Sequence, residues 1–302
     1  MSIQRGHGKC VSCPRRCGAD RSVRVGACGA GSLPYIARAA LHMWEEPCIS
    51  GKNGSGAIFF CGCNLRCVFC QNHDISRAEK GVRVDAQGLC DMMLNLRDIG
   101  AHNINLVTPT PHADVIICAL EKAKVRGLNI PVVYNTNGYE CTDTLKRLEG
   151  LIDIYLPDMK YVSPSAAKLY SGAEDYFEYA SKAIIEMQRQ VGALVTDENG
   201  MAKKGLIVRH LVLPCCVDET RRVLDFIARA LPISTHISLM SQYVPDGDAE
   251  KYPLINRRIT RGEYERAVDY CISLGFENVL IQERCAADKA FTPEFDGYIQ
   301  TE

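Results

Sequence analysis

The sequence predicts an α/β fold of parallel strands joined by crossover helices, preceded by a cysteine-rich segment. Strand-like and helix-like stretches alternate along residues 57–281, the pattern of parallel strands with helical connections. We count six such β/α units and a last short strand, fewer strands than the eight of a closed barrel. The length of 302 residues suits one large domain, or one domain with an appendage. We therefore expect a cysteine-rich metal-binding segment at 1–34 and the α/β domain at 35–302.

The expected strands are short apolar runs bounded by glycine, proline or polar turns. They lie at 57–61, 103–108, 130–135, 151–156, 206–213, 236–240 and 278–281. Pro131 stands at the start of its strand, where a missing N–H is tolerated, and Pro214 follows the end of another. The stretch 35–48 precedes them all. It is compatible with a helix or with an extended arm, and Pro47 would end the helix.

The expected helices alternate with these strands. They lie at 84–99, 113–126, 142–148, 175–191, 218–231 and 261–274. In the first of them apolar residues recur at helical spacing, and Gly100 stands where a helix commonly ends. Gly127 ends the second helix, and Asp218 is a plausible N-cap for the fifth.

Composition and charge argue against two classes of partner. The chain is 47% hydrophobic and 24% charged, as in an ordinary globular protein. Its formal net charge of -1 leaves no overall footprint for nucleic acid or an anionic membrane, although it allows a local basic patch. We find no run of about 18 apolar residues that would span a bilayer, and no apolar signal core at the N-terminus. We therefore expect a cytoplasmic protein without nucleic-acid or membrane partners.

Four of the sixteen cysteines gather near the N-terminus, at Cys10, Cys13, Cys17 and Cys28. In a chain of this length without an export signal, clustered cysteines are expected to bind metal rather than form disulfides. Glycines and basic residues surround them, so the segment could hardly become ordered without a metal. The four thiolates fit an auxiliary iron–sulfur cluster, which we favour slightly, or a structural zinc. Unligated surface thiols are the remaining alternative.

A second set, Cys63, Cys67 and Cys70, has the spacing C-x-x-x-C-x-x-C and follows the first expected strand. Three thiolates on one tight loop can hold three irons of a four-iron cubane and leave the fourth iron open for chemistry. A zinc loop or three buried thiols are the plain alternatives. A scaffold or electron carrier would instead need a fourth ligand, for which Cys61 and Cys48 lie near enough in sequence. Cys61 is still on the strand and is expected to point away from the loop.

Polar or turn-forming residues follow the expected strands. In parallel β/α folds the working groups lie at the C-terminal ends of the strands. Here these ends are the cysteine loop, 108–112, 135–138, 157–160, 214–216 and 241–243. Glu45 and Glu46 precede the first expected strand and could face the mouth of the cysteine loop. We favour the alternative that both are solvated or paired with nearby basic residues.

The cysteine loop and its flanks resemble the radical S-adenosylmethionine (SAM) enzymes. The resemblance rests on the three cysteines, on Phe69 before the third, and on the Cys-Asn-Leu-Arg-Cys lead-in at 63–67. The frames at 54–60 and 70–76 are similar to the branch of pyruvate formate-lyase activating enzyme. Within it the chain looks closest to the PflX-type proteins, because its extra cysteines stand at the N-terminus rather than after the loop. The resemblance covers most of residues 54–281 and implies an open, partial (β/α)6 barrel of the TIM type.

The same resemblance implies a cofactor site. Cys63, Cys67 and Cys70 would bind a [4Fe-4S] cluster whose open iron chelates SAM. Contacts to the cofactor are expected from Thr108, Thr110, His112, Asn135, Asn137 and His210. The sequence differs from the motifs of this family at two places. The segment 108–112 stands where the family has a Gly-Gly-Glu-like motif, and Asn135 stands where the activating enzymes have an aspartate.

Two further residues are assigned to catalysis. Asp158 and Lys160 match the Asp-x-Lys motif of the activating enzymes. An ordinary ion pair is the alternative for them, and a hydrogen-bonded structural role is the alternative for His210.

The resemblance also implies an activity. An electron from a flavodoxin- or ferredoxin-like donor would enable cleavage of SAM to a 5′-deoxyadenosyl radical, which abstracts a hydrogen atom from the substrate. The substrate expected first is a glycyl radical enzyme. Another peptide or a small molecule is the alternative within the enzyme class. An iron–sulfur electron-transfer or scaffold protein that does not cleave SAM is the alternative from another class.

Overall fold

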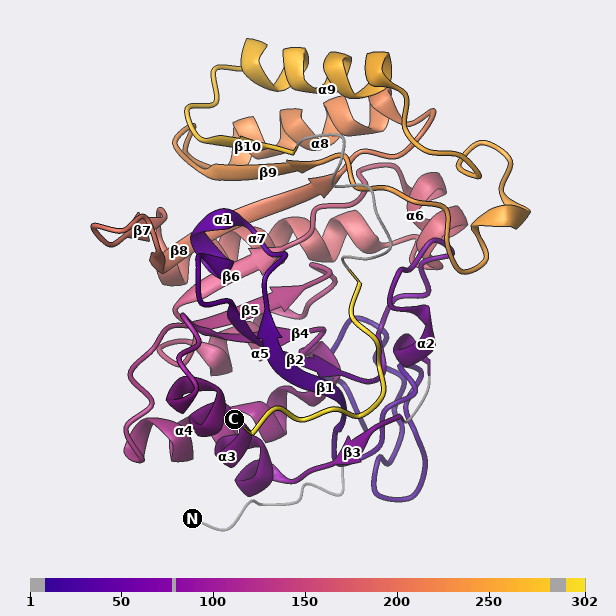
Figure 1. Cartoon of the computed structure of the whole chain (residues 1–302). Helices are drawn as coiled ribbons and strands as arrows, with labels where there is room; N and C mark the ends of the chain where they lie inside the picture. Colours follow the sequence, from indigo (N-terminus) through magenta and orange to yellow (C-terminus); the bar gives the residue numbers. More distant parts are fainter. Residues whose placement is uncertain (1–8, 78–79, 283–291, 302) are drawn as a thin grey trace.

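The structure, a computed structural model, describes residues 9–77, 80–282 and 292–301. Its centre is a ten-stranded sheet flanked by helices (Figure 1). The strands are β1 Tyr35–His42, β2 Ser55–Phe60, β3 Val82–Arg83, β4 Ile104–Val107, β5 Val132–Thr136, β6 Ile154–Pro157, β7 Val195–Thr196, β8 Ala202–Leu211, β9 His236–Met240 and β10 Val279–Ile281. The α-helices are α1 Pro47–Ser50, α2 His73–Ser76, α3 Ala86–Asp98, α4 Ala113–Val125, α5 Thr142–Leu148, α6 Pro164–Ser171, α7 Tyr176–Val191, α8 Val217–Ala230 and α9 Arg261–Ser273.

The sheet is a parallel barrel that does not close. Its strand order is β10-β9-β8-β6-β5-β4-β2-β1-β3, and every pair from β2 to β10 along this order is parallel. Each parallel strand is followed by a helix before the next one begins, as βαβ connections require. Within the described residues no ladder joins β10 to β1 or β3. The predicted open, partial (β/α)6 barrel is confirmed.

The long helices cover the outer face of the sheet. Helices that are near one another in the sequence pack in pairs, α3 against α4, α5 against α7, and α8 against α9 (Figure 1). The main core lies between helices and strands. It contains aromatic residues such as Tyr134 and Tyr155, whose rings meet edge to face with centroids 5.8 Å apart.

The stretch before the first parallel strand is extended, which settles the alternative that the sequence left open. β1 pairs antiparallel with β2 and with β3. The C-terminal residues run beside β1, because the N–H of Ala39 donates to Tyr298 O and that of Gly297 to Ala37 O. In Figure 1 this yellow segment follows β1 across the molecule. It covers a strand edge that would otherwise be unpaired.

The connection between β1 and β2, residues 43–54, fills the inside of the barrel near the starts of the parallel strands. Ile49 of α1 is fully buried in an apolar cluster with Val133, Ile154 and Ile207, residues of three parallel strands. Glu45, just before α1, reaches into the same interior and pairs with Arg209 of β8. This connection therefore acts as a plug that brings a carboxylate under the functional site.

Some boundaries differ from the predicted ones. α5 and β9 match their predicted ranges, whereas α6 was not predicted. Cys216 takes the N-cap position of α8, and Asp218, predicted to cap it, lies in its first turn. Residues 9–34 contain neither helix nor strand, and the predicted domain boundary at 34/35 stays a prediction. None of the helices that the structure describes is both long and apolar enough to cross a membrane.

Candidate active site

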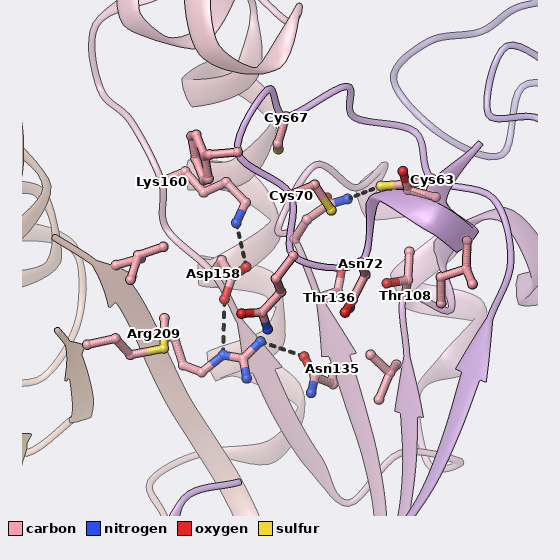
Figure 2. A pocket seen from close by; sticks show the side chains of 18 of the residues that line it. Cys63, Cys67, Cys70, Asn72, Thr108, Asn135, Thr136, Asp158, Lys160 and Arg209 are labelled. Carbon is pink, nitrogen blue, oxygen red and sulfur yellow. Dashed lines mark hydrogen bonds and ion pairs between the residues drawn. The ribbon is translucent and has the colours of Figure 1, made fainter. Parts of the chain in front are cut away.

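The loop between β2 and α2 brings three cysteines to one cavity. Cys63, Cys67 and Cys70 line it together with residues from the C-terminal ends of the parallel strands (Figure 2). All three are free thiols. The cavity therefore lies where a parallel α/β fold places its working groups, and its roof is the predicted cluster loop.

Hydrogen-bond donors surround the sulfur atoms. Asn137 Nδ2 lies 3.3 Å from Cys63 Sγ, and Ser171 Oγ lies 3.0 Å from Cys67 Sγ. Burial, with the neighbouring thiols adding to it, raises the pKa of Cys63 to about 12. Burial likewise raises the pKa of Cys70 to about 12. These thiols would lose their protons on binding a metal centre, which also needs the surrounding donors.

The three cysteines fit a cubane better than a single ion. Within the described ranges, no three histidine, cysteine or acidic side chains are arranged to hold one metal ion. A cubane gives each thiolate its own iron, so its ligands need not meet at one point. Three cysteines would therefore suit a four-iron cluster with one iron left for another ligand.

A row of charged groups crosses the floor of the cavity. Lys160 Nζ lies 2.6 Å from Asp158 Oδ2, and Arg209 Nε lies 3.0 Å from the other oxygen, Oδ1 (Figure 2). Arg209 also donates through Nη2 to Asn135 Oδ1, at 2.6 Å, and its Nη1 lies 3.3 Å from Glu45 Oε2. Two cations and two carboxylates thus alternate from the cluster loop to the plug.

Asp158, Lys160 and Arg209 of this row are charged in spite of their burial. Burial by itself would raise the pKa of Asp158, but the adjacent Lys160 and Arg209 hold it below the ordinary value. Burial by itself would lower the pKa of Lys160, but Asp158 and the thiol of Cys67 keep it above the ordinary value. Lys160 therefore presents an ammonium group beside the cysteines, where thiolates would need a positive partner.

The turn after β5 is held against the end of β6. A β-carbon at Gly138, whose φ is 79°, would lie 2.3 Å from Asp158 O, so this close approach needs a glycine. The hydroxyl of Tyr176 bonds to Asn137 O at 2.9 Å and to Asp158 O at 2.8 Å. These contacts fix Asn137 below Cys63.

A buried carboxyl group supports the same turn. Glu140 Oε1 accepts from Thr110 Oγ1 at 2.5 Å and from Thr136 Oγ1 at 2.6 Å. Burial raises the pKa of Glu140 to about 7, although both hydroxyls oppose the shift. Thr136 lines the cavity and Glu140 does not, so Glu140 holds the Thr136 hydroxyl from the side away from the cavity.

Five of the residues predicted to contact the cofactor or to act in catalysis face the cavity. They are Thr108, Asn135, Asn137, Asp158 and Lys160. Thr108 has a φ of 61°, an unusual value for a β-branched residue and the kind of strain that functional sites store. Their roles in binding or catalysis stay predictions.

Three predicted cofactor contacts lie elsewhere. Thr110 is buried against Glu140, and His112 is buried with Nε2 2.8 Å from Cys61 O. His210 lies between Met159 O, at 2.7 Å, and Thr220 Oγ1, at 2.9 Å. None of the three lines the cavity. The hydrogen bonds of His210 fit the structural role given as its alternative, and its contact to the cofactor stays a prediction.

Strand alternation explains the position of His210. Adjacent residues of a strand point to opposite faces, so Arg209 of β8 faces the cavity while His210 points to the helices. Both residues lie within the strand predicted at 206–213, but the sequence predicts a cofactor contact only for His210. The favoured solvated position of Glu45 and Glu46 was also wrong, because the Glu45 side chain is 11% exposed and Glu46 is buried. Pairing of Glu45 with a basic residue is confirmed.

Gln71, Asn72 and Gln242 complete the polar wall of the cavity. Gln71 and Asn72 directly follow Cys70, and Gln242 follows β9. Their position after a motif cysteine or a strand end was the available signal. Gln242 belongs to the predicted strand end 241–243, whereas Gln71 and Asn72 had no predicted role in the site.

Comparison with known proteins gives one family and one relative. Residues 57–192 match the family model of the radical SAM superfamily. An uncharacterized protein of Methanocaldococcus jannaschii is 32% identical over 273 residues, which cover 86% of this chain and 73% of that protein. The region shared with the relative therefore extends well beyond the cysteine loop.

Solved structures share the fold. Streptococcus suis SuiB bound to S-adenosylmethionine is 14% identical with a TM-score of 0.50, over 73% of this chain and 48% of SuiB. SuiB bound to its precursor peptide SuiA is 15% identical with a TM-score of 0.51, over 73% of this chain and 46% of SuiB. The chain thus spans about half the length of these structures, and the likeness at this identity concerns the fold.

Proposed function

Because the chain belongs to the radical SAM superfamily, we propose that it cleaves S-adenosylmethionine at a [4Fe-4S] cluster held by Cys63, Cys67 and Cys70. Membership of this enzyme superfamily implies both SAM and the cluster. Held by these cysteines, the cluster would supply the electron that splits SAM into methionine and a 5′-deoxyadenosyl radical, and this radical would take a hydrogen atom from the substrate.

The observation that carries the proposal is the set of three cysteines without a fourth at the same cavity. Cys61 Sγ donates to Lys80 O at 3.0 Å, and its side chain belongs to a separate apolar cluster. Cys48 lies in α1 within the plug and packs against the apolar cluster of Ile49. Neither of these two thiols lines the cavity, so the scaffold alternative lacks its suspected fourth ligand within the described part of the chain.

The walls offer partners for the polar groups of SAM. Lys160 and Arg209 are cations for its carboxylate, and Asp158 is an acceptor for its amino group. Thr108, Asn135 and Asn137 add neutral donors and acceptors. This polar wall takes the place of the Gly-Gly-Glu-like motif that the sequence lacks.

A polypeptide is the substrate we favour, with a glycyl radical enzyme as the first candidate by resemblance to the activating enzymes. A hollow of about 580 Å³ adjoins the cavity, shares Gln71 with it, and is lined by Thr292, Pro293 and other surface residues. A wide hollow beside the cofactor site suits a chain segment held across it. A small molecule bound in the inner cavity is the alternative.

The test is anaerobic reconstitution with iron and sulfide, reduction with dithionite, and quantification of 5′-deoxyadenosine after addition of SAM. The wild type should form 5′-deoxyadenosine. A Cys63→Ala, Cys67→Ala, Cys70→Ala triple variant should not. Cys118→Ala, which removes a thiol of α4, is the matched control and should behave as the wild type. If a fully loaded and reduced wild-type protein neither binds nor cleaves SAM, the proposal is wrong.

A further inference from the structure

The four N-terminal cysteines converge although no helix or strand holds them. A β-carbon at Gly26 would lie 3.4 Å from Cys17 Sγ and 3.4 Å from Cys28 Sγ. Backbone hydrogen bonds fold Cys10 back toward Cys17, because its N–H donates to Ala19 O at 3.1 Å and its carbonyl accepts from the N–H of Gly18 at 3.0 Å. The N–H of Arg16 donates to Cys13 O at 3.0 Å, which closes the turn between Cys13 and Cys17. The four cysteines therefore lie in one small region, and although no three of the described side chains are arranged to hold a single ion, a cubane gives each thiolate its own iron.

This set lies directly behind the loop of the candidate active site. The N–H of Cys63 donates to Cys28 O at 3.0 Å, so one hydrogen bond joins a cysteine of each set. Gly62 makes the approach feasible, because a β-carbon there would lie 3.0 Å from Cys28 O. Arg66 Nη2 donates to Ala27 O at 3.0 Å. A short path through bonded atoms thus connects Cys28 Sγ to Cys63 Sγ.

The two segments are also joined on the other side of the loop. Arg15 Nε donates to Asn64 O at 2.8 Å, and its guanidinium lies 5.4 Å from the centre of the Tyr139 ring. Arg21 donates to Pro111 O. The N-terminal set is therefore held at a fixed position relative to Cys63, as passage of an electron between the two would require.

The outer side of the N-terminal set reaches the surface. Cys10 and Cys17 are partly exposed, whereas Cys13 and Cys28 are buried. Val11, Val23 and Val25 of the same segment are 57%, 82% and 50% exposed. Isolated exposed valines are ordinary, but three within fifteen residues give the segment of the four cysteines an unusual share of exposed apolar side chains.

The segment is also basic. Residues 9–28 carry five positive charges and one negative in a chain of net charge -1. Arg15 and Arg21 bond to the barrel domain, whereas Lys9, Arg16 and Arg24 are exposed, as is the acid Asp20. Such a local field attracts an acidic protein and raises its rate of encounter.

We propose that Cys10, Cys13, Cys17 and Cys28 hold a second iron–sulfur cluster, which receives electrons from an acidic one-electron carrier protein and delivers them to the centre at Cys63. This inference rests on the proposed function. The carrier loses one electron and the centre bound by Cys63 gains it. The N-terminal centre accepts and releases that electron and returns to its starting oxidation state. A structural zinc, which takes up no electron, is the alternative.

The identity of the metal is tested without any activity assay. In the Cys63→Ala, Cys67→Ala, Cys70→Ala triple variant, reconstituted anaerobically, we expect about four irons and the electron paramagnetic resonance signal of one reducible cluster. Zinc in the protein as purified, with no iron bound after reconstitution, would overturn the proposal.

Electron delivery is tested by comparing two reductants on the doubly reconstituted protein. For wild type and a Cys10→Ser, Cys17→Ser variant we would measure 5′-deoxyadenosine formation with reduced flavodoxin and with dithionite. The ratio of the flavodoxin-driven to the dithionite-driven rate should fall roughly tenfold or more in the variant. An unchanged ratio contradicts the relay. Absence of product with dithionite in the wild type would instead contradict the proposed function.

A surface variant covers the case in which the cysteine variant does not fold. Val23→Asp adds a negative charge to the proposed docking surface and should lower the same ratio roughly tenfold. Val125→Asp, at a 90% exposed position on α4, is the control and should leave it unchanged. Equal ratios for both variants would show that the carrier docks elsewhere.

Discussion

Arg209 and Asp158 form an ion pair inside the barrel, with Arg209 Nε 3.0 Å from Asp158 Oδ1. Their side chains are 14% and 16% exposed. The pair joins β8 to the end of β6, and Glu45 of the plug extends it. Charges this deeply placed are stable only when they are paired, so the network is a sensitive point of both the fold and the site.

Removing the guanidinium should destabilise the protein strongly. Arg209→Met leaves two carboxylates facing one another without their common partner, and we expect the free energy of unfolding to fall by about 3 kcal/mol or more. Urea denaturation of the reduced apo-protein measures it. Arg261→Ala, which breaks an exposed pair with Glu265, should change the value by less than about 0.5 kcal/mol. Similar losses in both variants would mean that the buried network contributes no more to the free energy of unfolding than an exposed ion pair.

The donor below Cys63 should tune the cluster. Asn137 donates to Cys63 Sγ at 3.3 Å and to Asn64 Oδ1 at 2.9 Å. Asn137→Asp puts a carboxylate against a thiolate, so we expect roughly tenfold weaker iron binding and a lower reduction potential. Iron analysis and redox titration measure both. Asn199→Asp, in an exposed turn, is the control. A potential that stays the same or rises would contradict the role of Asn137.

Glu140 predicts a pH dependence of stability. Burial raises its pKa from 4.5 to about 7 in the folded protein. Between these values the unfolded chain releases the proton while the folded chain keeps it, so stability falls as pH rises and levels off above about 7. Urea denaturation should show that the wild type loses about 3 kcal/mol over this window relative to Glu140→Gln. Parallel curves for the two proteins would show that Glu140 does not titrate there.

The plug predicts a packing effect. Ile49 is fully buried among the inner side chains of three strands, and Ile49→Ala should lower the free energy of unfolding by about 3 kcal/mol. Val125→Ala, at a position 90% exposed, should change it by less than about 0.5 kcal/mol. The comparison uses urea denaturation of both apo-proteins. An equally small effect at Ile49 would mean that the plug is not packed as the structure shows.

The barrel was predictable because each parallel strand is a buried apolar run separated from the next by a helical stretch. The same reasoning located Asp158 and Asn135, since the ends of parallel strands meet at one edge. It could not place Glu45. The acid precedes the parallel strands in sequence, and only the antiparallel pairing of β1 with β2 turns it into the interior.

The other differences between the predicted and the observed structure have local causes. The short helix α6 begins at Pro164 within a stretch that was taken as the loop between a strand and a long helix. Thr110 and His112 follow a strand end, but a 3-10 turn over Thr110–His112 directs them away from the cavity. Proximity in sequence to a strand end therefore predicted the location of the site better than the direction of each side chain.

His210 provides the last test, because a structural histidine and a cofactor ligand respond differently to substitution. Both ring nitrogens lie within hydrogen-bond distance of buried partners, and burial lowers its pKa to about 4, so the ring is neutral. His210→Ala should lower the free energy of unfolding by about 2 kcal/mol, because Met159 O and Thr220 Oγ1 lose a partner. The affinity of the folded, cluster-loaded variant for SAM should stay within about twofold of the wild type, since no contact to the cavity is lost. Urea denaturation and equilibrium dialysis measure the two quantities. Unchanged stability with a large loss of SAM affinity would return His210 to the cofactor site.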